Sequence, residues 1–116
     1  MTFYEKRKEH NRFEEAKEEL ERLYGVKVLP VQADISAGAD NAAIAADVAA
    51  KAAEAFGGID VLINCAQASA SGVTLADHTT AQFDLALYSG LYATFYYMQA
   101  CYPYLAKSKG SVVNFA

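Results

Sequence analysis

The sequence has no tryptophan, only two cysteines and two prolines, and no apolar run near the ~20 residues that a membrane-spanning helix needs. Two cysteines without a paired spacing give little support for a disulfide framework or a metal site. We expect Cys65, in an apolar stretch, and Cys101, in a helical pattern, to be ordinary buried thiols. The first residues lack a positive region followed by an apolar core, so we expect no secretory signal and a cytoplasmic protein.

Acidic residues outnumber basic ones, and the net charge is −4 over 116 residues. Domains that bind nucleic acid usually carry a basic patch, so we expect no nucleic-acid partner. Hydrophobic residues make up 53% of the chain, which is enough to build a core. The length sets a ceiling of one domain over residues 1–116, about half of the ~250 residues that a single-domain α/β enzyme often has.

The stretch GGIDVLINCAQ, from Gly57 to Gln67, combines a helix stop, a strand and a polar strand end. The glycine pair ends an amphipathic helical pattern over Asn41 to Phe56, because glycine readily adopts a left-handed C-terminal turn. The consecutive apolar residues 61–63 predict an interior parallel strand that helices cover on both faces. The residues that follow lie at its carboxyl end, where open α/β sheets bind ligands. They are Asn64, Cys65 and Ala66.

This stretch resembles the Asn-Asn-Ala-Gly motif of the short-chain dehydrogenase/reductase family, preceded as there by a Phe-Gly-x-Ile-Asp-x-Leu sequence. Cys65 replaces the second Asn of the motif, and Gln67 replaces the Gly. Val26 to Ser36 is similar to the family's third strand, and Gly110 to Ala116 to its fifth. The resemblance implies an α/β fold, a partial Rossmann-like three-layer sandwich with a mainly parallel sheet in the order β-α-β-α-β-α-β.

Two parts of the family's pattern are missing from these residues. The glycine-rich turn Thr-Gly-x-x-x-Gly-x-Gly, which cradles the pyrophosphate of the cofactor, has no counterpart. The catalytic Ser and the Tyr-x-x-x-Lys pair, which follow the fifth strand, have none either. The resemblance thus implies a truncated form of an enzyme that transfers hydride between NAD(P) and an alcohol or ketone. We expect this segment to be inactive alone, with no catalytic residue and no bound cofactor. A noncatalytic scaffold or assembly module, and one half of a split enzyme, are the alternatives.

Three further residues are implied to contact the cofactor in the parent enzyme. Asp34, at the end of the expected strand 26–36, would cap the adenine pocket, with Ile35 beside the ring. Asp34 also suits a turn, because an aspartate side chain bonds its own downstream backbone. Arg7, in the Lys-Arg-Lys run after an expected strand tail at Thr2 to Tyr4, would favour NADP. The alternative for that run is the solvated basic start of a helix.

Helical patterns fill much of the remaining chain. The first covers Asn11 to Tyr24 and ends at Gly25. The longest begins at a capping box, Thr79 with Gln82, and continues to Tyr102, where Pro103 bends or ends it. Two apolar stripes are expected to face the core: Ile44, Val48, Ala52 and Phe56 on the middle helix, and Phe83, Leu87, Leu91, Thr94, Phe95, Met98 and Tyr102 on the long one.

The resemblance also bears on assembly and on the proton relay. In the family the long helix builds the main dimer interface, and the first strand lies beside the strand at Val61 to Cys65. We therefore expect a homodimer or higher oligomer, formed through the 80–102 helix or through the exposed strand edge. Gly90 stands where many members have the Asn that completes a proton relay, so Ser89 or a water molecule would replace it.

Overall fold

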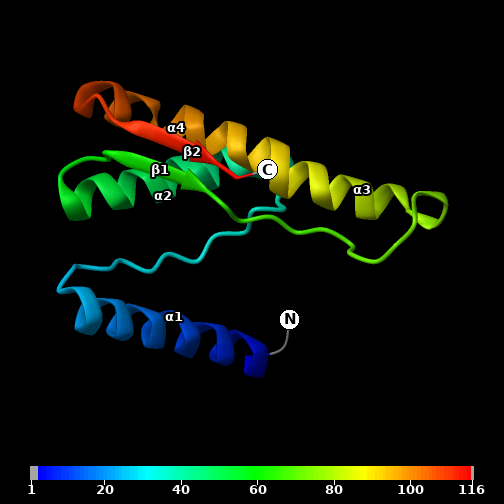
Figure 1. Cartoon of the computed structure of the whole chain (residues 1–116), viewed down its shortest axis with the longest axis horizontal. Coiled ribbons are helices and arrows are strands. Elements are labelled where there is room, and N and C mark those ends of the chain that lie inside the picture. The colour runs from blue at the N-terminus through cyan, green and yellow to red at the C-terminus, as the bar shows by residue number, and fades with distance from the viewer. Residues whose placement is uncertain (1–2, 116) are drawn as a thin grey trace. The chain divides into compact units, whose positions relative to one another are not determined.

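The computed structural model describes residues 3–115, with side chains from Arg12 onward, and it divides into two compact units, 1–32 and 33–116. The first unit contains helix α1 (Phe3–Tyr24) and an extended segment (Figure 1). The second contains two strands and the remaining helices. In chain order these are the 3-10 turn η1 (Gly38–Asp40), α2 (Asn41–Phe56), β1 (Val61–Asn64), the 3-10 turn η2 (Leu75–Asp77), α3 (Thr80–Ala86), the π-helix η3 (Leu87–Tyr92), α4 (Ala93–Ser108) and β2 (Ser111–Asn114).

Helix α1 ends where the sequence predicts and begins earlier. Gly25 adopts a φ of 62°, and its N–H donates to the Glu21 carbonyl at 3.0 Å, which closes the last turn. At the other end, Phe3 and Tyr4 are helical, so the expected strand tail is wrong at these two residues. The following Glu-Lys-Arg-Lys-Glu run consists of good helix formers, which extend the helix backwards. Thr2 lies outside the described residues.

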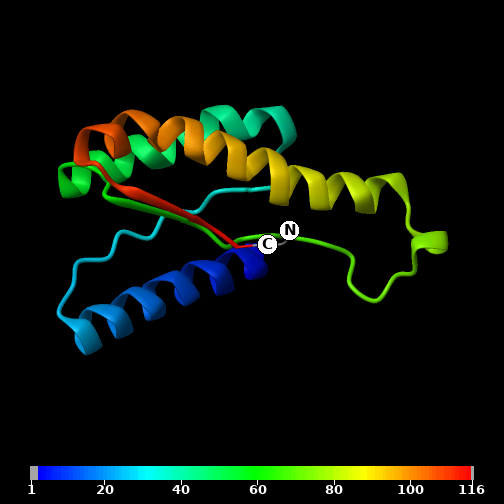
Figure 2. The ribbon, with the colours of Figure 1, turned by 45° about the horizontal axis from the view of Figure 1, so that its top comes forward.

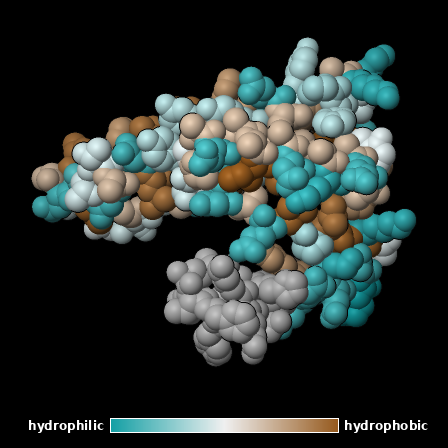
Figure 3. Space-filling model, turned by 180° about the vertical axis from the view of Figure 1, so that it is seen from behind, coloured by the Kyte–Doolittle hydropathy of each residue, from teal (hydrophilic) through white to brown (hydrophobic). Residues whose placement is uncertain are grey.

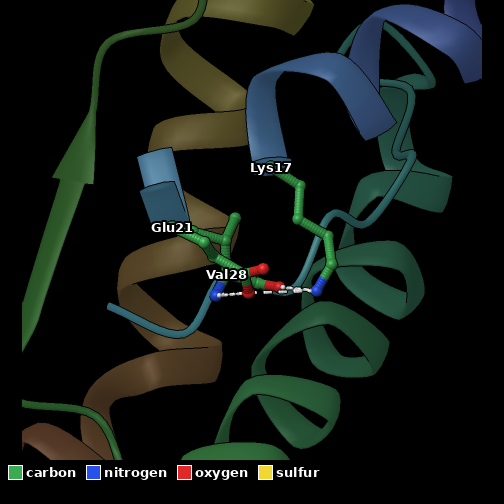
Figure 4. Close-up of polar contacts among 3 residues, drawn as sticks. All are labelled: Lys17, Glu21 and Val28. Carbon is green, nitrogen blue, oxygen red and sulfur yellow. Dashed lines mark hydrogen bonds and ion pairs between the residues drawn. The ribbon is translucent and has the colours of Figure 1, made fainter. Parts of the chain in front are cut away.

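The segment after Gly25 is extended without forming a strand. Residues 25–34 have no regular secondary structure, so the expected strand at Val26 to Ser36 is wrong. The backbone groups of Val28, near the start of this segment, bond to side chains instead of to a neighbouring strand (Figure 4). The Val28 N–H donates to Glu21 Oε1 at 3.0 Å, and the Val28 carbonyl accepts from Lys17 Nζ at 3.0 Å. An apolar alternating segment becomes a strand only when another strand supplies these bonds.

The second unit is built on a parallel pair of strands. β1 and β2 pair in register from Val61 opposite Ser111 to Asn64 opposite Asn114, as Figures 1 and 2 show. Helices α2 and α4 pack against each other on one face of this pair (Figure 2). Their shared core is small and mostly helical. It contains Ala49, Cys101 and Leu105, with Ile59, Leu62, Ala100 and Tyr104 packed around it.

The other face of the strand pair is open within this unit. Leu62 points toward the helices, whereas Val61 is 55% and Ile63 60% exposed. The prediction of a strand buried on both faces is therefore wrong for these residues. Figure 3 shows hydrophobic side chains, in brown, at the surface of the molecule in that view. The parallel α/β class is confirmed, with two of the four expected strands present among residues 3–115.

Small residues occupy the contact between the two helices. Besides Asn41 at its start, the buried positions of α2 are Ala45 and Ala49, one residue away from the predicted stripe, whose Phe56 is exposed. On the long helix they are Ser89, Ala93, Cys101 and Leu105, while four members of the predicted apolar face are exposed: Phe83, Leu91, Phe95 and Tyr102. Small side chains let two helices approach closely, so packing favours them over the bulkier stripe.

The boundaries of the long helix agree with the sequence at its start only. Thr79 and Gln82 form the predicted capping box, with each side chain accepting from the other residue's N–H. The helix then passes through Pro103 and continues to Ser108, so of the two predicted effects of Pro103, ending the helix is wrong and bending it stays a prediction. Pro103 is exposed, and solvent can therefore bond the carbonyl that its missing N–H leaves free.

Candidate functional site

Two asparagines meet at the carboxyl ends of the strands. Asn64 Nδ2 donates to Asn114 Oδ1 at 2.8 Å, and Asn114 Nδ2 approaches the sulfur of Met98 on α4 at 3.5 Å. The backbone continues the pairing, because the Phe115 N–H donates to the Asn64 carbonyl at 3.0 Å. The sequence predicts Asn64 as a site residue and misses Asn114, although Asn114 ends the second apolar strand in the same way.

The π-helical turn η3 touches the loops that hold the predicted cofactor-side residues. A side chain at Gly38 would meet the ring of Tyr88 at 4.0 Å, which places the loop after Asp34 beside η3. Ser89, the next residue of η3, bonds Ala68 in the loop after β1. A π turn is rare and is frequently found at functional sites. This turn therefore joins two loops that are more than 25 residues apart in the sequence.

Ser89 is a structural anchor for the loop after β1. Its side chain is fully buried, and Oγ accepts from the Ala68 N–H at 2.9 Å. The hydroxyl proton is shared between the Leu85 carbonyl at 2.7 Å and the Ala68 carbonyl at 2.9 Å. These contacts use the single proton and one of the two lone pairs of the hydroxyl. The structure thus gives Ser89 an anchoring role, and the suggestion that it replaces the missing relay asparagine stays a prediction.

Gly90 lies directly against Gln67. If Gly90 had a Cβ, its nearest neighbours would be Nε2, Cδ and Cγ of Gln67, at 3.5, 3.6 and 3.6 Å. The Gln67 carboxamide thus covers the surface that a side chain at position 90 would occupy. Both residues depart from the family pattern, and the sequence alone gives no sign that the two departures touch.

Asp34 forms the turn that the sequence offers as one of its two interpretations. Its Oδ1 accepts from Ser36 Oγ at 2.7 Å and from the Ser36 N–H at 2.8 Å. These two bonds, the hydroxyl first and the backbone second, lower the pKa of the Asp34 carboxyl. Ile35 is held by its carbonyl, which accepts from Nδ2 of the buried Asn41 at 2.7 Å. The carboxylate remains exposed, so contact with an adenine ring stays a prediction.

Of the remaining predicted site residues, the structure describes the side chains of Cys65 and Ala66 and leaves that of Arg7 outside the described residues. Cys65 and Ala66 are exposed beyond the end of β1, so the expected burial of the Cys65 thiol is wrong. A side chain one residue past a short strand has no second layer to cover it. Cys101 is buried as predicted, and burial raises the pKa of its thiol. Arg7 lies in helix α1, and its side chain is outside the described residues.

Other binding features are few over the described part of the chain. No group of three or more His, Cys, Asp or Glu side chains is placed to hold a metal ion there. Among the described helices, none has the length and apolar character to cross a membrane. An open pocket of about 320 Å³ lies at the start of α3. Its lining residues are Leu75, His78, Thr79, Thr80 and Phe83.

Comparison with known proteins agrees with this arrangement. The family model described as short chain dehydrogenase matches residues 3–116. A 12alpha-hydroxysteroid dehydrogenase of a Clostridium species is 57% identical over 102 residues, which is 88% of this chain and 39% of the relative. The human hydroxysteroid dehydrogenase-like protein 2 is 42% identical over 94 residues, 81% of this chain and 21% of the relative. The chain therefore spans well under half the length of these relatives.

Solved structures show the same fold. A short chain dehydrogenase from Burkholderia cenocepacia, in complex with NADP, has a TM-score of 0.77 and 28% identity, covering 90% of this chain and 40% of that one. An alcohol dehydrogenase from Thermococcus sibiricus, complexed with 5-hydroxy-NADP, has a TM-score of 0.79 and 22% identity, covering 90% and 42%. The second likeness concerns the fold alone. Both chains are more than twice as long as the part that matches.

Proposed function

Because this chain belongs to the short chain dehydrogenase family, we propose that it is part of an NAD(P)-dependent oxidoreductase that interconverts an alcohol and a ketone. The observation that carries the proposal is the pair Asn64 and Asn114, whose amides lie together at the carboxyl ends of two parallel strands. In an open α/β sheet this is the edge where the ligand crevice forms. The π turn η3 beside it ties the loops after Asp34 and after Asn64 to the same edge.

The residues at this edge suit the adenosine part of a dinucleotide. The exposed Asp34 carboxylate can accept from an exocyclic amine, and Ile35 offers an apolar contact to a ring. Asn64, Cys65 and Ala66 provide an amide and small side chains that let a ribose approach the strand end. When bound, the nicotinamide of this cofactor gives or receives the hydride. Arg7 supports a slight preference for NADP through its positive charge.

A hydroxysteroid is the substrate class that we propose for the whole protein. The 57% identity to the 12alpha-hydroxysteroid dehydrogenase supports it, together with the likeness to hydroxysteroid dehydrogenase-like protein 2. The test is an assay of a longer protein that contains these residues with the flanking parts of its gene. NADP-linked oxidation of a 12α-hydroxysteroid is the expected result. Turnover of simple alcohols with no oxidation of any hydroxysteroid would overturn the substrate class.

The 116 residues alone are expected to lack both turnover and tight cofactor binding. They contain no glycine-rich turn, so the backbone N–H groups that would hold a pyrophosphate are missing. Isothermal titration with NADP and with NAD should show no binding tighter than about millimolar, or ~4 kcal/mol. A micromolar dissociation constant for either nucleotide would contradict this expectation.

Two alternatives for the chain itself are a noncatalytic scaffold or assembly module and one half of a split enzyme. Mixing the chain with a separately expressed polypeptide that supplies the glycine-rich turn and the Ser, Tyr and Lys separates them. Recovery of dehydrogenase activity on mixing favours the split enzyme. Stable assembly without activity favours the scaffold.

We propose a cytoplasmic location for the protein.

The exposed apolar surface supports self-association of the chain. Large apolar side chains are exposed on both the strand pair and the long helix. They are Val61, Ile63, Phe83, Leu91 and Phe95. Exposed apolar strands and patches of this kind favour pairing with another chain. Sedimentation at micromolar concentration should give a homodimer or larger species, and Leu91→Lys or Ile63→Lys should shift it toward the monomer. A clean monomer for the unmodified chain would contradict the proposal.

A further inference from the structure

We propose that Gln67 supplies from the loop after β1 the side-chain amide that the helix lacks at Gly90, and that it acts as a positioning residue in the reaction. Its carboxamide would hold a water molecule or a ligand hydroxyl beside the π turn. This inference rests on the oxidoreductase function proposed above.

Gln67 and Gly90 are in direct contact. The three atoms nearest to an added Cβ at Gly90 all belong to the side chain of Gln67, and the amide nitrogen is the closest at 3.5 Å. A single methyl group fits at this distance, because 3.5 Å is ordinary van der Waals contact. A branched polar side chain at position 90 would need the volume that the carboxamide fills. An amide can therefore reach this place either from the helix or from the loop.

Hydrogen bonds fix the backbone on both sides of this contact. Ala68, next to Gln67, has its N–H and carbonyl bound to the fully buried Ser89, next to Gly90. On the other side, Thr94 Oγ1 donates to the Gly90 carbonyl at 2.6 Å. The backbones on which both residues sit are thus held against each other. The loop and the helix are thus fixed where the side chain starts, which keeps the Gln67 carboxamide within reach of the π turn.

The polar atoms of the Gln67 side chain are available to a ligand. Gln67 is exposed, and no hydrogen bond of its side chain is present among the described residues. A carboxamide has two N–H donors and one carbonyl acceptor, so it can accept a hydrogen bond from a water molecule or ligand hydroxyl while donating another. It lies three residues after Asn64, at the carboxyl end of β1 where the ligand crevice forms. Packing alone would be served equally well by an apolar side chain.

The test uses the longer protein with its flanking sequence, in four forms: unmodified, Gln67→Gly, Gly90→Asn, and the double variant. Gln67→Gly should lower kcat by about 10-fold or more, because the water molecule or ligand hydroxyl is then held less well, while KM for the cofactor changes little. The double variant should recover most of kcat, because the amide then comes from the helix. Ser69→Ala, an exposed neighbour in the same loop, is the matched control and should keep full activity.

The outcomes separate this inference from the function on which it rests. An unmodified enzyme that shows no turnover with any hydroxysteroid or simple alcohol overturns the proposed function. An active unmodified enzyme with kcat unchanged in Gln67→Gly overturns the inference alone. So does a double variant no more active than Gln67→Gly, provided that its circular dichroism is unchanged. A shift of the pH profile of kcat in Gln67→Gly, reversed in the double variant, supports the amide's part in positioning over a role in packing.

Discussion

The side-chain amides of Asn64 and Asn114 lie opposite each other at the carboxyl ends of β1 and β2, with Nδ2 of Asn64 donating to Oδ1 of Asn114 at 2.8 Å. The same two residues are partners in the backbone register of the parallel pair. Asn114 also contacts Met98, which connects the pair to helix α4. This bond orients the polar groups at the edge of the sheet where the proposed cofactor binds.

Truncation of either asparagine should weaken the strand pair modestly. For Asn64→Ala or Asn114→Ala we expect the free energy of unfolding to fall by about 0.5–1.5 kcal/mol, the usual net value of one hydrogen bond. The double variant should lose less than the sum of the two single losses, because both remove the same bond. Urea denaturation measures all three. Ser111→Ala, at the other end of β2, is the control, and additive losses would show that the amides are not coupled.

The two cysteines should differ sharply toward a thiol reagent. Cys65 is exposed, whereas Cys101 is only 4% exposed and burial raises the pKa of its thiol, which lowers the thiolate fraction at neutral pH. In the native protein at pH 7.5 or so, one thiol should react quickly and the second at least about 10-fold more slowly, until denaturant exposes it. Cys65→Ser should remove the fast phase. A fast phase that survives this substitution would place the accessible thiol elsewhere.

The contact of Glu21 with Val28 should depend on pH. The Val28 N–H and then the Lys17 side chain lower the pKa of the Glu21 carboxyl. A carboxyl whose pKa is lowered by folding stabilises the folded state at any pH above its unfolded pKa, which is about 4.3 for Glu. This stabilisation is lost as the pH falls through the pKa of the folded state. Hydrogen exchange of the Val28 amide should therefore be slow near neutral pH relative to its intrinsic rate, and this protection should decline in acid.

Two substitutions test this contact directly. Glu21→Ala should abolish the protection of the Val28 amide at neutral pH, because it removes the acceptor at 3.0 Å. Glu18→Ala, an exposed acidic neighbour on the same helix, should leave the protection unchanged. Equal protection in both variants would mean that Glu21 does not hold the extended segment.

Gly110 should tolerate no side chain. A Cβ at this position would overlap the Asp60 carbonyl oxygen and lie 2.9 Å from Cδ2 of Leu105. The adjacent Ser111 N–H donates to the same Asp60 carbonyl, so the backbone cannot move away freely. Gly110→Ala should lower the free energy of unfolding by about 1–3 kcal/mol, as overpacking commonly does. Thermal unfolding measures this loss. Ala106→Gly, on the exposed side of α4, is the control, and it should lose about 1 kcal/mol through helix propensity alone. A loss at Gly110 no larger than this would show that the contact is relaxed.

Local patterns in the sequence predicted much of the secondary structure. Helix α2 ends at Phe56 because Gly57 adopts a φ of 81°, and α3 begins at the predicted capping box. Both are decided by residues within one turn, so they can be predicted from neighbours in the chain. The apolar run at 61–63 likewise predicted the first strand, and the resemblance of Gly110 to Ala116 to the family's fifth strand implied the second.

Tertiary contacts decided the rest. Whether Val26 to Ser36 is a strand depends on a partner for its backbone, and Lys17 and Glu21 take that place at Val28. Which face of α2 is buried depends on the helix opposite, which selects Ala45 and Ala49 over larger neighbours. The sequence alone determined the family and named Gln67 and Gly90 as separate departures from its pattern. Only the fold brought them together, because contact between residues on different elements depends on how those elements pack.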